Sequence, residues 1–170
     1  MSKSIRCVAG AMGLCAMLGL AVPVAFSHPE GEPWGKPETE VRRVFDIGQG
    51  ESVVIDVDGA GFFHAAEIVK TGGASDKTLV VIEMDGRPSM DYSFATLSNQ
   101  MRWLQSHDMV ANVKKAGDTG TMTLWFRAPI EYRYSLKVVV HVGEEGVSSL
   151  NLRVLRSMPD EAGDHQGHDH

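Results

Sequence analysis

The chain has 170 residues, with 16 Lys and Arg against 22 Asp and Glu and a formal net charge of −6. That balance argues against a nucleic-acid-binding protein, which needs a basic surface, and mainly favours solubility. Both cysteines, Cys7 and Cys15, fall within the first 27 residues, so the rest of the chain has no thiol for disulfides, metal ligation or nucleophilic catalysis.

Residues 1–27 have the three-part pattern of a secretory signal peptide. Lys3 and Arg6 precede an apolar run, and the small residues Ala25 and Ser27 favour cleavage before His28. An N-terminal membrane anchor is the alternative, but the apolar run is shorter than the ~20 residues that span a bilayer. We therefore expect a secreted or periplasmic protein without a membrane anchor after cleavage. The remaining 143 residues suit one domain, and their 14 basic and 22 acidic residues give a net charge of −8.

Residues 28–40 are rich in Pro and Gly, a composition that favours an extended leader over a packed element. Trp34 lies within this leader. Because a lone exposed Trp is unusual in a solvated linker, we expect Trp34 to pack against the body of the protein. Stacking of Trp34 on a ligand is the alternative.

From residue 41 to residue 158, apolar and polar residues mostly alternate with the period of two that is typical of half-buried β-strands. Strands are expected over 41–47, 53–57, 62–69, 78–84, 108–115, 119–127, 131–142 and 150–154. Pro129 is expected to separate two of them. Residues 89–94 are ambiguous, and residues 95–105 suit either a short helix with Leu97, Met101 and Leu104 on one side or a loop.

The stretch from Val57 to Pro88 is the most informative part of this pattern. It contains two strand-like runs bordered by Asp58-Gly59 and Asp85-Gly86, dipeptides that favour chain reversal. We therefore expect these two runs to pair with each other. Eight or nine evenly spaced strands with almost no helix predict an all-β protein, an antiparallel β-sandwich of the jelly-roll type.

Residues 159–170 form a polar tail that is expected to be disordered. The residues that could ligate a metal alternate along it: His165, His168 and His170 with Asp164 and Asp169. Imidazoles and carboxylates in this arrangement suit Zn²⁺, Ni²⁺ or Cu²⁺, although the entropy lost when a flexible tail closes around an ion limits the affinity. A tail that is only solvated is the alternative.

Cleavage before His28 would leave an N-terminal histidine whose amino group and imidazole could chelate copper. His64, His107 and His141 are the candidates for a further ligand of such a site. His64 lies in the middle of an expected strand, where a hydrogen-bonded core or sheet-face histidine is the other explanation.

Glu67 and Glu83 lie on the two runs that are expected to be neighbours, so they could form a pair of carboxylates. Two carboxylates at a suitable separation catalyse glycoside hydrolysis, but glutamates on strands more often face water. The sequence has no GxSxG, HExxH or phosphate-binding glycine loop. It therefore gives no reason to expect a required cofactor.

Three motifs resemble those of the DUF2961 jelly-roll family. They are Gly59-Ala60-Gly61, Asp85-Gly86-Arg87-Pro88-Ser89 and Trp125-Phe126-Arg127-Ala128-Pro129, within a similarity that runs from about Val54 to Val142. The resemblance implies a jelly-roll fold. Some members of that family are glycoside hydrolases acting on furanosides, but their catalytic carboxylates cannot be placed on this sequence.

These observations predict an exported, non-enzymatic binding or assembly module, with a glycan or another protein as its partner. A periplasmic metal-binding protein that uses the histidine tail is the second interpretation. A small relative of the jelly-roll glycoside hydrolases, completed by a homo-oligomer, is the third.

Overall fold

The computed structural model describes residues 34–99, 103–105 and 108–159. The described chain consists of antiparallel strands and one short helix. In chain order these are β1 (Pro37–Phe45), β2 (Ser52–Asp58), β3 (Gly61–Gly72), β4 (Leu79–Met84), β5 (Arg87–Ser93), α1 (Phe94–Asn99), β6 (Trp103–Gln105), β7 (Met109–Ala116), β8 (Thr119–Tyr132), β9 (Ser135–His141) and β10 (Val147–Ser157).

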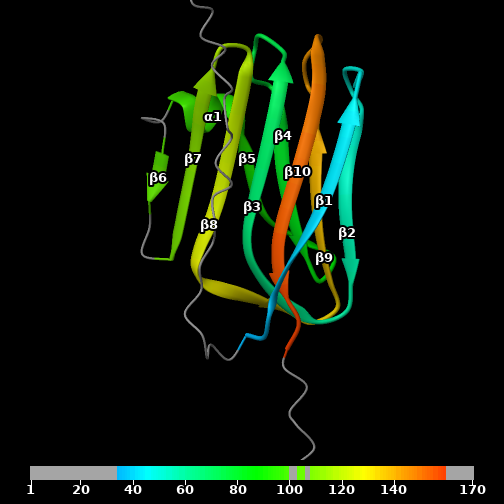
Figure 1. The fold of residues 1–170 in the computed structure, drawn as a ribbon, viewed down its shortest axis with the longest axis vertical. Helices are drawn as coiled ribbons and strands as arrows, with labels where there is room; N and C mark the ends of the chain where they lie inside the picture. Colours follow the sequence, from blue (N-terminus) through cyan, green and yellow to red (C-terminus); the bar gives the residue numbers. More distant parts are fainter. Residues whose placement is uncertain (1–33, 100–102, 106–107, 160–170) are drawn as a thin grey trace, which may run out of the picture. The chain divides into compact units, whose positions relative to one another are not determined.

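The strands form two packed sheets (Figure 1). The larger has six strands in the order β1-β10-β3-β8-β7-β6, and the smaller has four in the order β2-β9-β4-β5. Four antiparallel pairs are nested along the chain, namely β1 with β10, β2 with β9, β3 with β8 and β4 with β5. Further pairing of β10 with β3 and of β9 with β4 joins these pairs into sheets. A long ribbon wrapped in this way is a jelly roll, so the predicted fold class is confirmed.

The core lies between the sheets because alternate residues of each strand point inward. Val80 and Ile82 of β4 and Leu136 and Val138 of β9 are fully buried on the inner side of the smaller sheet. Leu152 of β10 belongs to the same apolar cluster from the larger sheet. The helix α1 also contributes to this core through Phe94 and Leu97.

Local chemistry explains one chain reversal and the start of the helix. Asp85 and Gly86 have φ values of 54° and 72°, so they form a two-residue turn with both φ angles positive between β4 and β5. Ser93 then begins α1 as an N-cap, because its Oγ accepts a hydrogen bond of 2.9 Å from the N–H of Thr96.

The expected pairing of the two runs between Val57 and Pro88 is wrong. The first run is β3, which pairs with β8 and β10 in the larger sheet. The second is β4, which pairs with β5 and β9 in the smaller sheet. The segment 73–78 therefore crosses from one sheet to the other, as jelly-roll topology requires. The Asp85-Gly86 turn makes a hairpin with β5 instead.

Several boundaries also differ from the expected ones. β1 begins at Pro37, within the stretch expected to be leader. β8 continues through Pro129 to Tyr132. Residues 126–129 lie opposite His64, where the register between β3 and β8 shifts. Proline has no N–H to donate, and at such a shift the strand pair does not require one. β9 starts only at Ser135, which leaves Tyr134 in a turn with 73% of its surface exposed.

Candidate functional site

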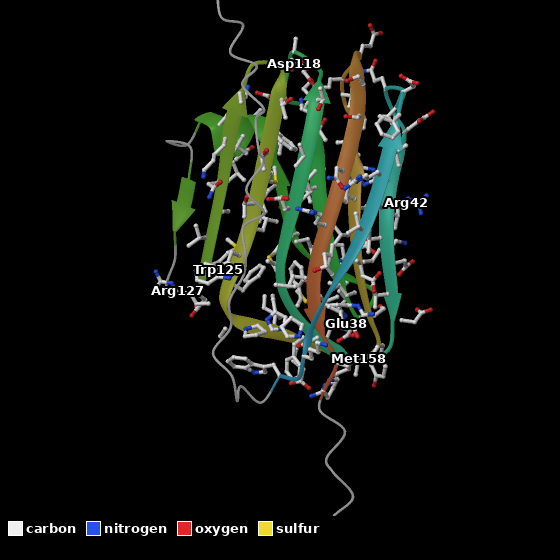
Figure 2. The ribbon with its side chains drawn as sticks, viewed as in Figure 1. Glu38, Arg42, Asp118, Trp125, Arg127 and Met158 are labelled. Carbon is white, nitrogen blue, oxygen red and sulfur yellow. The ribbon has the colours of Figure 1, made fainter. Side chains whose placement is uncertain are left out.

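The outer face of the six-stranded sheet is an open surface with chemistry suited to a ligand. The strand register aligns its side chains in three rows, which read Val110–Trp125–Ala65–Leu155–Thr39, Asn112–Thr123–Glu67–Arg153–Val41 and Lys114–Thr121–Val69–Asn151–Arg43. Neighbouring strands lie ~4.8 Å apart, so each row is about 19 Å long. Figure 2 looks onto this sheet, and no described helix or strand packs on its outer side. We call these three rows the tryptophan face.

Trp125 is the aromatic residue of this face. It stands on β8 between Val110 of β7 and Ala65 of β3, and it is half-buried. Arg127 follows two residues later on the same strand, and Figure 2 shows the two close together, near the end of the sheet where β7 begins. An indole in this position offers a flat apolar surface with one N–H donor at its rim.

Three polar atoms of the tryptophan face have no hydrogen-bond partner within the described chain. They are Oδ1 of Asn112, Oδ1 of Asn151 and Nε of Arg153, and each is shielded from solvent. A shielded polar atom without a partner typically destabilises a protein by about 1–3 kcal/mol. Such atoms are rare in native proteins, and each of these three is too enclosed for a ligand on the surface to contact it.

Glu67 and Arg153 sit side by side in the middle row. The Nη1 of Arg153 lies 3.4 Å from Oε1 of Glu67, and the two side chains are 42% and 19% exposed. The pair therefore places a donor fork and a carboxylate next to each other at the centre of the face. The hydroxyls of Thr121 and Thr123 flank them on β8.

The expected placement of Glu67 and Glu83 on neighbouring strands is wrong. Glu67 lies on the outer side of the larger sheet, whereas Glu83 lies on the outer side of the smaller one, opposite Lys137 of β9. Packed sheets are about 10 Å apart, and these two side chains point away from each other across the sandwich. They cannot form the carboxylate pair of a glycosidase, whose two groups face one substrate.

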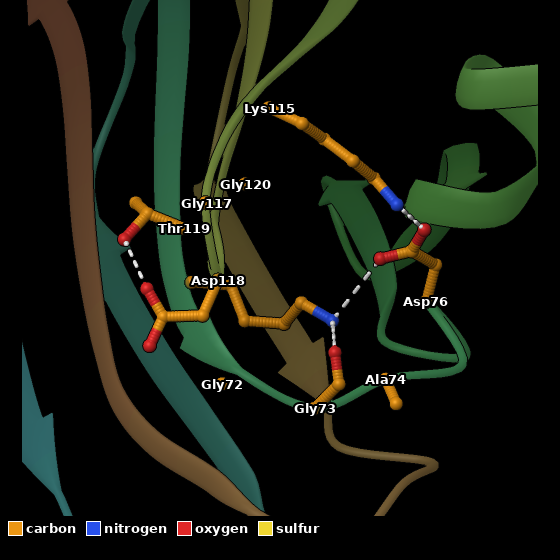
Figure 3. A pocket seen from close by; sticks show the side chains of 10 residues that line it. Gly72, Gly73, Ala74, Asp76, Lys115, Gly117, Asp118, Thr119 and Gly120 are labelled. Carbon is orange, nitrogen blue, oxygen red and sulfur yellow. Dashed lines mark hydrogen bonds and ion pairs between the residues drawn. The ribbon is translucent and has the colours of Figure 1, made fainter.

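A second candidate is a polar pocket at one end of the sandwich, shown in Figure 3. Its volume is about 280 Å³, close to the lower limit for small-molecule sites. The β3–β4 loop and the β7–β8 turn form its walls, with Lys70, Gly72, Gly73, Ala74, Asp76, Lys115, Gly117, Asp118, Thr119 and Gly120 as lining residues.

The charges near this pocket are already paired with one another. Asp76 bonds both Lys70 and the more exposed Lys115. Lys70 also donates to the carbonyl of Gly73 at 3.4 Å and to Glu144 at 2.5 Å, and its ammonium lies 5.3 Å from the centre of the Phe94 ring. All three donors of Lys70 are thereby used, so the network holds the loops together and leaves little for a ligand.

Glu144 is the hub of that network. Its carboxylate accepts hydrogen bonds from the N–H groups of Ser75 and Asp76 at 2.8 and 2.9 Å and from the hydroxyl of Thr78 at 2.9 Å. Burial alone would raise the pKa of Glu144, but the bonds from Lys70, Thr78 and Ser75 outweigh it and lower that pKa to about 2.

A buried polar cluster occupies the opposite end of β3 and β10. His64 and Ser157 share a hydrogen bond of 2.7 Å and are 1% and 0% exposed, so the interpretation of His64 as a hydrogen-bonded buried residue is confirmed. Arg156 donates to Glu40 through Nε and Nη2 at 3.2 and 2.8 Å. Burial raises the pKa of the neighbouring Tyr132 phenol, although the Arg156 guanidinium partly offsets this. With both Ser157 and His64 enclosed, the cluster stabilises the fold and offers no reactive surface.

The residues predicted to bind metals are placed as follows. His28, His107 and the tail residues Asp164, His165, His168, Asp169 and His170 lie outside the described residues. His141 is exposed and shares a hydrogen bond of 2.6 Å with Ser52. Within the described ranges, no group of three or more His, Cys, Asp or Glu is arranged to hold a metal ion. Trp34 is half-buried at the start of the described chain.

No protein-family model matches this chain, and no curated protein is significantly similar to it. The resemblance to the DUF2961 family therefore stays a prediction. Among the described residues, no helix has the length and apolar character needed to cross a membrane.

Sequence reasoning missed the tryptophan face as a site. The alternation along 119–127 does place Thr121, Thr123 and Trp125 on one side of a strand, opposite the core residues. Their neighbours Asn112, Asn151 and Arg153, however, come from strands far apart in the chain. Only the register of the folded sheet brings them together.

Proposed function

We propose that this protein is an exported, non-enzymatic binding module whose tryptophan face holds a glycan. The observation that carries the proposal is the half-buried Trp125 on the same open sheet face as the Arg153–Glu67 pair, whose side chains are 42% and 19% exposed. Sugars combine hydroxyl groups, which both donate and accept hydrogen bonds, with apolar C–H surfaces. The face offers both kinds of contact.

Recognition would divide between these groups according to their chemistry. The indole of Trp125 would stack on the C–H side of a sugar ring. The neighbouring residue on β3 is Ala65, whose small side chain leaves room for that ring. The carboxylate of Glu67 would accept from sugar hydroxyls, and the guanidinium of Arg153 would donate to them. Because both side chains are partly exposed, a sugar would reach them without displacing a strand.

A polysaccharide-binding experiment tests this proposal. The chain from His28 is run in native gels that contain soluble polysaccharides, and retarded bands are followed by calorimetric titration. Trp125→Ala is expected to weaken binding roughly tenfold, in keeping with about 1–1.5 kcal/mol for an aromatic contact. Tyr134→Ala removes an exposed aromatic residue that lies off the face, and it is the matched control.

The outcome separates the proposal from its competitors. Loss of binding in Trp125→Ala with native circular dichroism, and none in Tyr134→Ala, supports it. Equal binding by both variants and the unmodified chain rejects the tryptophan face as the site. Turnover of a furanoside substrate by the unmodified chain would instead favour the glycosidase interpretation.

A metal-binding role of the histidine tail is the second proposal, on the basis of the alternating His and Asp residues between 164 and 170. It is compatible with the first, because the tail and the sheet use different residues.

A further inference from the structure

We infer that the ligand of the tryptophan face is an acidic polysaccharide. This inference rests on the proposed function and specifies its ligand class. It starts from the charge of the face, which differs in sign from that of the protein. Residues 28–170 carry 14 basic and 22 acidic residues, a net charge of −8.

Basic residues outnumber acidic ones on the tryptophan face. Lys114, Arg153 and Arg43 lie within its three rows, against the single carboxylate of Glu67. Arg127 follows Trp125 at its edge and is exposed. Two further acidic residues lie beyond its rows: Asp118 in the β7–β8 turn, whose Oδ1 is 3.5 Å from the Thr119 hydroxyl, and Glu131 near the far end of β8. A local positive surface on an acidic protein attracts anionic partners in general. Shape and hydrogen bonding must therefore select one anionic partner from the others.

The cations are distributed across the face. Lys114 and Arg43 stand at the two ends of one row, four strand spacings or about 19 Å apart, and both are exposed. Arg153 lies between them in the adjacent row. A single small anion could reach only one of these groups. An extended polymer with charges at regular intervals could reach all three.

Arg153 is placed to bind an acidic group. Its side chain is 42% exposed, and its bond of 3.4 Å to Glu67 uses Nη1. The guanidinium therefore keeps exposed charge for a charge-assisted pair with an anion. Glu67 would then be a positioning residue that fixes the orientation of the guanidinium.

The test compares two forms of one polymer. Binding of polygalacturonate and of its fully methyl-esterified form is measured by calorimetric titration, since esterification removes the charge and keeps the sugar backbone. Dextran sulfate and neutral dextran form a second pair. We expect polygalacturonate to bind at least tenfold more tightly than its methyl ester, and dextran sulfate to bind at least tenfold more tightly than neutral dextran. We also expect its affinity to fall severalfold between 50 and 500 mM NaCl, since salt screens exposed charges.

The variants assign the effect to the face. Arg153→Gln and the exposed Lys114→Gln should each weaken polygalacturonate binding, about tenfold and about threefold respectively. Lys137→Gln removes a basic charge from the outer side of the smaller sheet and should have no effect. If Arg153→Gln lowers the melting temperature, Lys114→Gln still tests the inference, because that side chain is exposed.

Each result has a defined meaning. Equal binding of the acid and its methyl ester, still abolished by Trp125→Ala, overturns the acidic ligand and leaves the glycan proposal intact. A preference for the acidic form in the polygalacturonate pair alone supports the inference and identifies the acidic group as a carboxylate. An equal loss in Lys137→Gln shows that net charge, and not this face, attracts the polymer. Absence of binding to all four polymers and to other glycans rejects the inference and the proposed function together.

Discussion

The ammonium of Lys70 and the carboxylate of Glu144 form a hydrogen bond of 2.5 Å, and each side chain is only 2% exposed. Lys70 belongs to β3 in the larger sheet, and Glu144 lies in the loop that joins β9 to β10. The pair therefore ties the crossover loop after β3 to a loop from the other half of the chain. It also holds in place the glycine-rich loop that lines the end pocket.

Glu144→Gln should destabilise the fold strongly. The amide keeps the shape of the side chain but removes its charge, which leaves the buried Lys70 ammonium with only the longer 3.4 Å contact to Asp76, a carboxylate that it shares with Lys115. Breaking one partner of a buried pair typically destabilises a protein by about 3–5 kcal/mol. Urea unfolding followed by circular dichroism measures the change, and the neighbouring exposed Glu145→Gln is the control. Adding Lys70→Met should restore part of the stability. A variant as stable as the control would contradict the role given to Glu144.

Stability should also fall in acid because of the same carboxylate. The pKa of Glu144 is about 2 in the folded chain, below its ordinary 4.5, so the unfolded chain binds more protons between these values. The stabilisation is complete above about pH 5 and is lost as the pH falls toward 2. At ~1.4 kcal/mol per pKa unit it amounts to about 3 kcal/mol. Urea unfolding across this pH range should show the loss. The difference between the unmodified chain and Glu144→Gln should shrink in parallel, and a constant difference would show that Glu144 does not titrate.

The class of fold was predictable because it depends on a local pattern. Alternation of apolar and polar residues along Val80–Met84 or Leu136–Val142 identifies half-buried strands without knowledge of their partners. The partners themselves depend on long-range contacts. Asp85-Gly86 was read correctly as a turn, yet the strand before it pairs with β9, whose residues lie more than 50 positions later. Lys70 and Glu144 are 74 residues apart, and neither has a local signal that marks it as buried.

Gly61→Ala should destabilise the protein more than Gly59→Ala. A Cβ on Gly61 would overlap the Tyr132 hydroxyl and come within 2.7 Å of the Ser157 carbonyl, both in the buried cluster. Overpacking of this kind usually destabilises a fold by about 1–3 kcal/mol. Gly59 has open space around it, so alanine there meets only the strain of a φ of 98°. Thermal unfolding of the two variants provides the comparison. Equal melting temperatures would show that the added methyl group at position 61 costs no more than the backbone strain at position 59.

Asp85→Ala should loosen the turn between β8 and β9. The Asp85 carboxylate accepts hydrogen bonds from the N–H groups of Arg133 and Tyr134 at 2.9 and 2.7 Å and, more weakly, from Ser135. The bond from Tyr134 and its neighbours holds the pKa of Asp85 below its ordinary value. Without this acceptor, amide hydrogen exchange at residues 133–135 should quicken at least tenfold.

Two further variants give that experiment its controls. Asp85→Asn keeps an acceptor oxygen and tolerates the positive φ of this position, so exchange should change little. Asp56→Ala removes an exposed carboxylate whose ion pair with Lys137 is long, at 3.9 Å. Exchange at 133–135 should stay unchanged in this variant. Protection that survives Asp85→Ala would mean that the strand ends alone fix this turn.

Removal of the histidine tail should abolish binding of divalent transition metals. The tail offers three imidazoles and two carboxylates within seven residues, whereas the described residues contain no group of three or more metal ligands. Calorimetric titration of Zn²⁺ and Cu²⁺ is therefore expected to show binding to the chain from His28 to His170 and none to a chain ending at Pro159. Affinity should rise with pH through the histidine range, about 6 to 7, because imidazole must be neutral to ligate a metal. If both chains bind alike, the ligands lie elsewhere, and the N-terminal amino group with His28 becomes the first candidate. If neither binds, the tail has no metal-binding role.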